Sequence, residues 1–320
     1  MRHFRRCKRL LPIGLLIIAM LAISSTGLIA EDKPAADAKT APATIAAPAA
    51  AAPEEEKPTG DATVAVLSQY FWRGYELSRN SMVIQPSLTV GYKGFSANIW
   101  GNLDTKAYYS GTDVGKSYGS TWNETDYTLS YAKMIGLFNL GAGYIYYGLG
   151  SLNKDAPKRA DSQEIFASVG LNTLLSPTFT VYKEISSYRQ IYYLLGISHS
   201  LELSKTISLK LAASGSYLQS SYADATLFNA GAGYGGYPKF DSNAQATNDK
   251  FSNFHDGNVT VSLPIKATKY ITLTPTVSYI FPLSDDARYE MKRQGLKGSA
   301  APAERDSSFV YGGLIASFTF

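Results

Sequence analysis

The chain of 320 residues is poor in cysteine, histidine and charge: it has 1 cysteine, 3 histidines and 18% charged residues. The single cysteine, Cys7, lies in the basic segment that opens the chain. The rest therefore has no thiol for a disulfide or for cysteine catalysis. No interior apolar run is long enough for a membrane-spanning helix. No Cys/His cluster or acidic loop has metal-ligand spacing, so neither a metal nor a cofactor is expected.

The first 30 residues have the pattern of a secretory signal peptide. A basic head from Arg2 to Arg9 precedes an apolar stretch from Leu10 to Ile23, and cleavage is expected after Ala30. An uncleaved membrane anchor is the alternative. Cleavage removes five of the 30 basic residues and leaves 25 against 26 acidic ones, so the net charge changes from +4 to −1. The basic pI then belongs to the signal and indicates no nucleic-acid partner.

Residues 31–60 are dominated by alanine, proline, glutamate and lysine. This stretch has no aromatic residue and no apolar period, so it cannot bury enough surface to fold. The sequence predicts a disordered periplasmic linker over 31–60 and a folded part over 61–320.

From residue 61 onward, segments of about ten residues alternate apolar and polar side chains, which is typical of transmembrane barrel strands. In the last segment, Val310, Leu314, Phe318 and the terminal Phe320 share one parity, whereas Ser317 lies on the other. A closing strand that ends on an aromatic residue is typical of an outer-membrane barrel. An edge strand of a soluble sandwich is the alternative for this segment alone.

The alternation predicts an all-β fold, a transmembrane antiparallel β-barrel of about 12 strands in the bacterial outer membrane. Long loops are expected at 107–121, 150–161, 221–253 and 283–306, with short turns on the other side. An even strand count puts both ends of the barrel on the short-turn, periplasmic side. The expected partners are outer-membrane lipid and, during insertion, the barrel-assembly machinery, and the oligomeric state stays open. The predicted strands lie near 62–76, 82–93, 95–106, 122–134, 137–149, 162–173, 177–187, 190–202, 206–220, 254–265, 269–282 and 307–320.

Residues 66–104 carry a more specific pattern. Ser68, Tyr70, Arg73 and Gly74 form an S-x-Y-x-x-R-G motif, which is followed by Gln85-Pro86, Gly94-Phe95 and Trp100-Gly101. In these residues the chain resembles the TorF-type porin family of Gram-negative outer-membrane proteins, whose function is largely unassigned. The resemblance implies a Gram-negative outer membrane and a pore, but no substrate. The long Ala/Pro linker departs from the family, and Ile315 stands where the outer-membrane insertion signal has a glycine.

If the apolar parity faces lipid, the opposite parity faces the lumen and carries the charged residues. A charge on the lipid face near mid-membrane would cost about 2–4 kcal/mol for Arg or Lys. Acids outnumber bases in the inward set, which predicts a weak cation preference. Alternatively, the charges pair with one another and plug a narrow barrel, with Arg73 as a strut to one of the acids. The residues predicted to line a pore are Arg73, Asp104, Glu124, Asp126, Glu164, Glu184 and Lys210.

These patterns predict a porin-like channel for passive diffusion of small hydrophilic solutes or ions, and no enzyme. An outer-membrane enzyme such as a phospholipase is the rival, and it requires a nucleophile, a histidine and an orienting polar residue within reach. Strand parity places His199 and His255 on the outward face, and no G-x-S-x-G motif is present. A surface adhesin or receptor that acts through loops 221–253 and 283–306 is a third alternative.

Overall fold

The computed structural model describes residues 57–78, 81–107, 119–150, 161–186, 188–223, 235–294 and 302–320. The predicted signal peptide, and the predicted linker up to residue 56, lie outside these residues. The first strand, β1 (Thr59–Leu67), begins within the last two residues of the segment predicted as linker.

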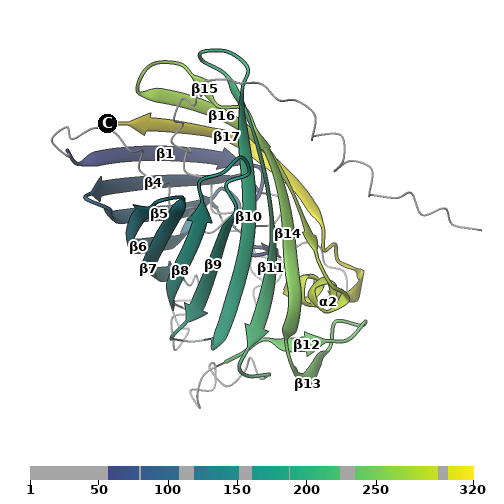
Figure 1. Cartoon of the computed structure of the whole chain (residues 1–320). Coiled ribbons are helices and arrows are strands. Elements are labelled where there is room, and N and C mark those ends of the chain that lie inside the picture. Colours follow the sequence, from purple (N-terminus) through teal and green to yellow (C-terminus); the bar gives the residue numbers. More distant parts are fainter. Residues whose placement is uncertain are drawn as a thin grey trace, which may run out of the picture. The chain divides into compact units, whose positions relative to one another are not determined.

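Twelve antiparallel strands form one closed barrel (Figure 1), which confirms the predicted fold and strand count. Each strand pairs with the next along the chain, and β14 pairs with β16 to complete the ring. The two-residue strand β15 (Ile265–Lys266) pairs with β16 beside the ring. After β1, the barrel strands are β4 (Val83–Tyr92), β5 (Phe95–Asp104), β6 (Thr121–Ile135), β7 (Phe138–Leu149), β8 (Ser162–Leu171), β9 (Thr178–Glu184), β10 (Gln190–Glu202), β11 (Ser208–Ser220), β14 (Ser252–Ser262), β16 (Ile271–Pro282) and β17 (Phe309–Thr319).

The barrel closes where β17 pairs with β1, from Asp61 opposite Thr319 to Leu67 opposite Gly313. Beyond the last pair, the backbone N–H of Gly60 donates to the carbonyl of Phe320 at 2.8 Å, and Phe320 donates back at 2.9 Å. Both strands at the seam are therefore paired. Their backbone N–H and C=O groups are hydrogen-bonded to each other, as backbone groups within a membrane must be.

The connections fall into two classes at the two ends of the barrel. Short turns follow β4, β6, β8, β10 and β14, and the two-residue turn after β4 has left-handed φ angles of 52° at Lys93 and 83° at Gly94. The opposite end carries longer connections, including β12 (Pro238–Phe240), β13 (Ala246–Lys250), α2 (Asp285–Gln294) and η3 (Pro302–Glu304). Among the described residues, no helix is long and apolar enough to cross a membrane.

The outer surface is apolar and ends in two belts of aromatic rings. Exposed aliphatic side chains such as Leu88, Leu129 and Val261 cover its middle, on the parity that the sequence assigns to lipid. Such a girdled apolar band on a closed barrel is the signature of a membrane-spanning barrel. Exposed rings near the short turns include Tyr92, Phe95, Tyr131, Phe138, Phe179, Tyr270, Phe318 and Phe320, and those near the long loops include Trp122, Tyr127, Phe254 and Tyr279.

The prediction of one strand over 62–76 is wrong in its second half. Strand β1 ends at Leu67, and the chain then forms a small hairpin of β2 (Phe71–Trp72) and β3 (Tyr75–Glu76) that does not pair with the wall. We call residues 68–78 the luminal hairpin. The alternation of side chains continues through this segment, because its rings are buried against opposite sides of the lumen. The resulting sequence pattern is the same as that of a wall strand.

Candidate functional site

The luminal hairpin turns at Arg73 and Gly74, the last two residues of the S-x-Y-x-x-R-G motif. Their φ angles are 48° and 81°, and Trp72 pairs with Tyr75 across the turn. Two consecutive left-handed residues are the geometry of a type I′ turn, which explains the glycine at the second position. A side chain on Gly74 would also collide with Met291 of α2. The motif therefore builds a tight tip that presents Arg73.

Aromatic side chains of the hairpin contact widely separated parts of the barrel wall. Phe71 packs on β17, Tyr70 on β5 and Trp72 on β7. Because these strands lie on different sides of a closed ring, the hairpin lies inside the lumen. The ring-centroid distances are 4.9 Å for Phe71–Phe309, 5.6 Å for Tyr70–Trp100 and 5.9 Å for Trp72–Tyr147.

Arg73 and Glu164 form a buried ion pair between the hairpin and β8. The two guanidinium nitrogens donate to the two carboxylate oxygens at 2.7 Å each, and the side chains are only 6% and 1% exposed. The guanidinium carbon lies 4.2 Å from the ring centroid of Tyr192 and 5.0 Å from that of Tyr182. A bidentate pair between aromatic faces is the geometry that suits arginine. The ion pair between Arg73 and one of the inward acids, which the sequence raised as an alternative, is thus present, and the acid is Glu164.

The other predicted pore-lining residues lie on the wall at two levels. Glu124 accepts a hydrogen bond from the Tyr70 hydroxyl at 2.9 Å, and Glu184 accepts one from Ser162 at 3.0 Å. Asp104, Glu124, Asp126 and Glu184 are all buried near the long-loop end. Lys210 is half-buried near the short-turn end of β11, at the other end of the barrel wall from these four acids.

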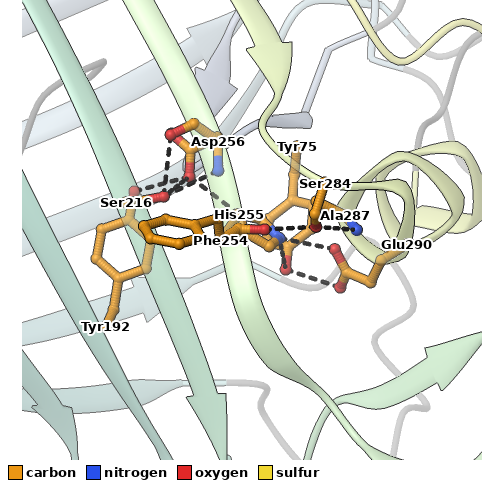
Figure 2. Close-up of polar contacts among 9 residues, drawn as sticks. All are labelled: Tyr75, Tyr192, Ser216, Phe254, His255, Asp256, Ser284, Ala287 and Glu290. Atoms are coloured by element: carbon orange, nitrogen blue, oxygen red, sulfur yellow. Dashed lines mark hydrogen bonds and ion pairs between the residues drawn. The ribbon is translucent and has the colours of Figure 1, made fainter.

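Helix α2 closes over the hairpin from the long loop after β16. Ser284 caps its start: the hydroxyl accepts the Ala287 N–H at 3.1 Å and donates to the Phe254 carbonyl of β14 at 2.6 Å (Figure 2). One face of the helix, with Ala287, Glu290 and Met291, is at most 1% exposed. The cap and this buried face fix the helix against the barrel.

Asp286 ties the outer side of α2 to its neighbours. It accepts a hydrogen bond from Asn253 at 2.8 Å and pairs with Lys239 of β12 at 3.0 Å. Burial would raise the pKa of Asp286, but these two partners outweigh it and hold the pKa below its ordinary value. This tether therefore stabilises the fold above the ordinary carboxyl pKa and is lost as the pH falls through the lowered value.

His255 joins α2, the hairpin and β14 in one buried network (Figure 2). Its Nε2 lies 2.9 Å from Glu290 and its Nδ1 lies 3.0 Å from Asp256, and all three side chains are nearly inaccessible. The Tyr75 hydroxyl donates to Glu290 at 2.7 Å, and Ser216 donates to Asp256 at 2.7 Å. The hairpin, α2, β11 and β14, which lie far apart in the chain, therefore meet in one network around His255.

The prediction that His255 faces outward is wrong, because β14 contains a β-bulge. The pairing of β11 with β14 shifts between Gly215 and Tyr217, so that His255 and Asp256 together oppose Ser216. One extra residue reverses the parity of everything on one side of it. His199, by contrast, lies near the short-turn end of β10 and is within 2.8 Å of the Leu174 carbonyl.

The buried network does not assemble a hydrolase triad. In such a triad, histidine lies between the nucleophile and the acid. Here Asp256 lies between Ser216 and His255, and both nitrogens of His255 face carboxylates. Among the described residues, no serine hydroxyl is hydrogen-bonded to either described histidine. The contacts instead fasten the hairpin and α2 to the wall.

The short-turn half of the lumen has a different lining. Its inward side chains are small and polar, and most are half-exposed. Several bond across strands, as Asn98 does with Ser87 and Thr89 at 2.8 Å each. Small hydroxyl side chains line this half of the lumen, whereas the rings of the hairpin fill the other half. This lining includes Ser87, Thr89, Asn98, Thr128, Ser130, Ser168, Ser198, Thr260 and Thr276.

Replacing Glu290 by Ala should loosen α2. The change removes the carboxylate that the Tyr75 hydroxyl and one nitrogen of His255 share, and leaves them only their 3.3 Å contact with each other. A buried polar group that loses its partner costs about 1–3 kcal/mol. We expect faster hydrogen exchange of the α2 backbone amides in the variant, while the barrel amides keep their protection.

Arg288→Ala on the same helix is the matched control, because Arg288 pairs with Asp285 at 2.9 Å on an exposed face. Equal exchange in the two variants would show that the His255 network does not hold the helix.

No family model matches the chain, and no curated protein matches it either. The resemblance to TorF-type porins therefore stays a prediction.

Several solved barrels are similar in structure. The NanC porin has 13% identity and a TM-score of 0.45, and the match covers 81% of this chain and 98% of that one. An outer-membrane channel of Pseudomonas putida F1 has 11% identity and a TM-score of 0.41, with 84% and 97% covered. Salmonella typhi OmpF has 8% identity and a TM-score of 0.32, with 82% and 97% covered.

These similarities are too low to support an argument about function. The strand pairing, the lipid-facing belts and the polar lumen of the chain itself identify the architecture. The protein is a twelve-stranded β-barrel of the bacterial outer membrane.

Proposed function

We propose that the protein is a channel through which small hydrophilic solutes and ions cross the outer membrane by passive diffusion. The observation that carries the proposal is the polar lining of the lumen inside an apolar outer surface. A barrel that served only as a membrane anchor would have no need of a half-exposed hydroxyl lining along several strands. The luminal hairpin and α2 then form the narrowest part of the path, at the long-loop end.

We further propose a weak preference for cations. Asp104, Glu124, Asp126 and Glu184 lie on the wall at the level of the hairpin. Glu164 is balanced by Arg73, so it adds little to the field while the pair is intact. Acidic rings attract cations and repel anions in narrow pores, where side-chain charges act at short range.

Neutralising Glu124 and Asp126 together should reduce this preference. The double variant Glu124→Gln/Asp126→Asn removes two negative charges from the narrow level while it preserves side-chain size. We expect the reversal potential in a potassium chloride gradient to move toward zero in planar bilayers. The double variant Asp241→Asn/Asp249→Asn is the control, because both residues are exposed on the β12–β13 hairpin.

Clear anion selectivity of the unaltered protein would contradict the cation preference. The absence of any conductance, even in a variant without the luminal hairpin, would contradict the channel function itself.

A further inference from the structure

The groups that hold Arg73 belong to the barrel wall and form a site of their own. Glu164 on β8 presents both carboxylate oxygens to the guanidinium, and Tyr147 on β7 donates to one of them at 2.9 Å. The rings of Tyr182 on β9 and Tyr192 on β10 lie at 5.0 and 4.2 Å from the guanidinium carbon. Four adjacent strands thus supply a carboxylate, a hydroxyl bonded to that carboxylate, and two aromatic faces around one planar cation.

Arg73 reaches this site from the hairpin, which is covalently continuous with the wall only at its two ends and is held elsewhere by side-chain contacts. Carboxylate and aromatic faces recognise an organic cation by charge and by cation–π attraction, whichever molecule carries it. Arg73 therefore competes with free cations as an intramolecular ligand. A free cation can occupy the site when the hairpin tip moves out of it.

We propose that Glu164, Tyr182 and Tyr192 form a binding site for organic cations that carry a guanidinium or alkylammonium group. Arg73 is the resident occupant, and an incoming cation displaces it together with the hairpin tip. The binding stands on the geometry alone, whereas its use in transport rests on the proposed channel function.

The charge on the wall supports displacement by a cation rather than by an anion. When Arg73 leaves, the buried Glu164 loses its counter-ion. A cation that takes the place of Arg73 restores the balance. A neutral solute leaves the buried carboxylate of Glu164 without a counter-charge, which is costly.

The test uses the full mature barrel with Arg73→Ala, which empties the site and leaves the wall unchanged. Methylguanidinium is the probe, and methylurea is its neutral match in size and shape. We expect millimolar methylguanidinium to raise the thermal unfolding midpoint of Arg73→Ala by several degrees in a saturable manner, and methylurea to leave it unchanged. The double variant Arg73→Ala/Glu164→Gln should lose the response to methylguanidinium.

Arg288→Ala controls for general effects of the salt, because Arg288 lies on an exposed face of α2. An equal response of Arg73→Ala and Arg288→Ala to methylguanidinium would overturn the proposal, as would an equal response to methylurea. If Arg73→Ala does not insert into membranes, Arg73→Ser receives the same comparison. Conductance is measured separately, so that the two proposals can fail independently. Saturable binding without conductance would support the cation site and contradict the channel function. Conductance without binding would support the channel function and contradict the cation site.

Discussion

Replacing residues 69–78 by a flexible glycine–serine linker should raise the single-channel conductance severalfold. Trp72 packs against two clusters of buried residues, one that includes Tyr147 of β7 and one that includes Leu67 of β1, so this segment spans the lumen. Its removal exchanges close-packed rings for water. The wall strands keep their pairing, because none of them hydrogen-bonds to β2 or β3 within the sheet.

The measurement is single-channel current in planar bilayers, with insertion checked by the heat-dependent gel migration of folded barrels. A matched control places glycine and serine at Ser242 and Asn243, in the exposed turn between β12 and β13. An unchanged conductance in the hairpin variant would mean that the narrowest part of the path lies elsewhere.

Replacing Glu164 by Ala should cause the largest loss of stability of any single change in the lumen. The guanidinium of Arg73 would stay buried without its counter-charge, which costs about 3–5 kcal/mol. The double variant Arg73→Met/Glu164→Leu should recover most of this loss, since well-packed apolar residues often replace a buried pair at little cost. Urea unfolding in lipid vesicles measures both variants.

The pair of Lys239 with Asp286 is the control, because these side chains are 35% and 24% exposed. Breaking it with Lys239→Met, which leaves the bond from Asn253 to Asp286 in place, should cost no more than about 1 kcal/mol. If the losses of Arg73→Met and Glu164→Leu simply add in the double variant, the two residues are not energetically coupled.

The sequence predicts the barrel well because membrane strands obey one simple rule. Lipid on one side and polar lumen on the other impose a period of two, and β16 shows it clearly: Leu273 and Val277 are exposed, whereas Thr274 and Ser278 are buried. The inward direction of the predicted acids follows from the same rule. Their role as pore lining stays a proposal.

Two parts of the site could not be predicted because they break the rule locally. At the luminal hairpin, the left-handed Arg73 is a rare conformation for a residue other than glycine, and only the following Gly74 hints at the turn. At the bulge, Ser216 faces two residues, and no pattern in the sequence around His255 marks the inserted one. The approach of Glu290 depends on a long loop, which periodicity does not describe.

The contacts of the luminal hairpin also bear on the order of assembly. The hairpin follows the first strand in the chain, but Arg73 meets Glu164 across 91 residues and Tyr75 meets Glu290 across 215. Contacts this distant in sequence form only after the intervening chain has been arranged, because the entropy of closing so long a loop must first be overcome. We therefore expect the wall to close around an empty lumen and the hairpin to dock last. A newly inserted barrel would then pass through a stage more permeable than its finished form.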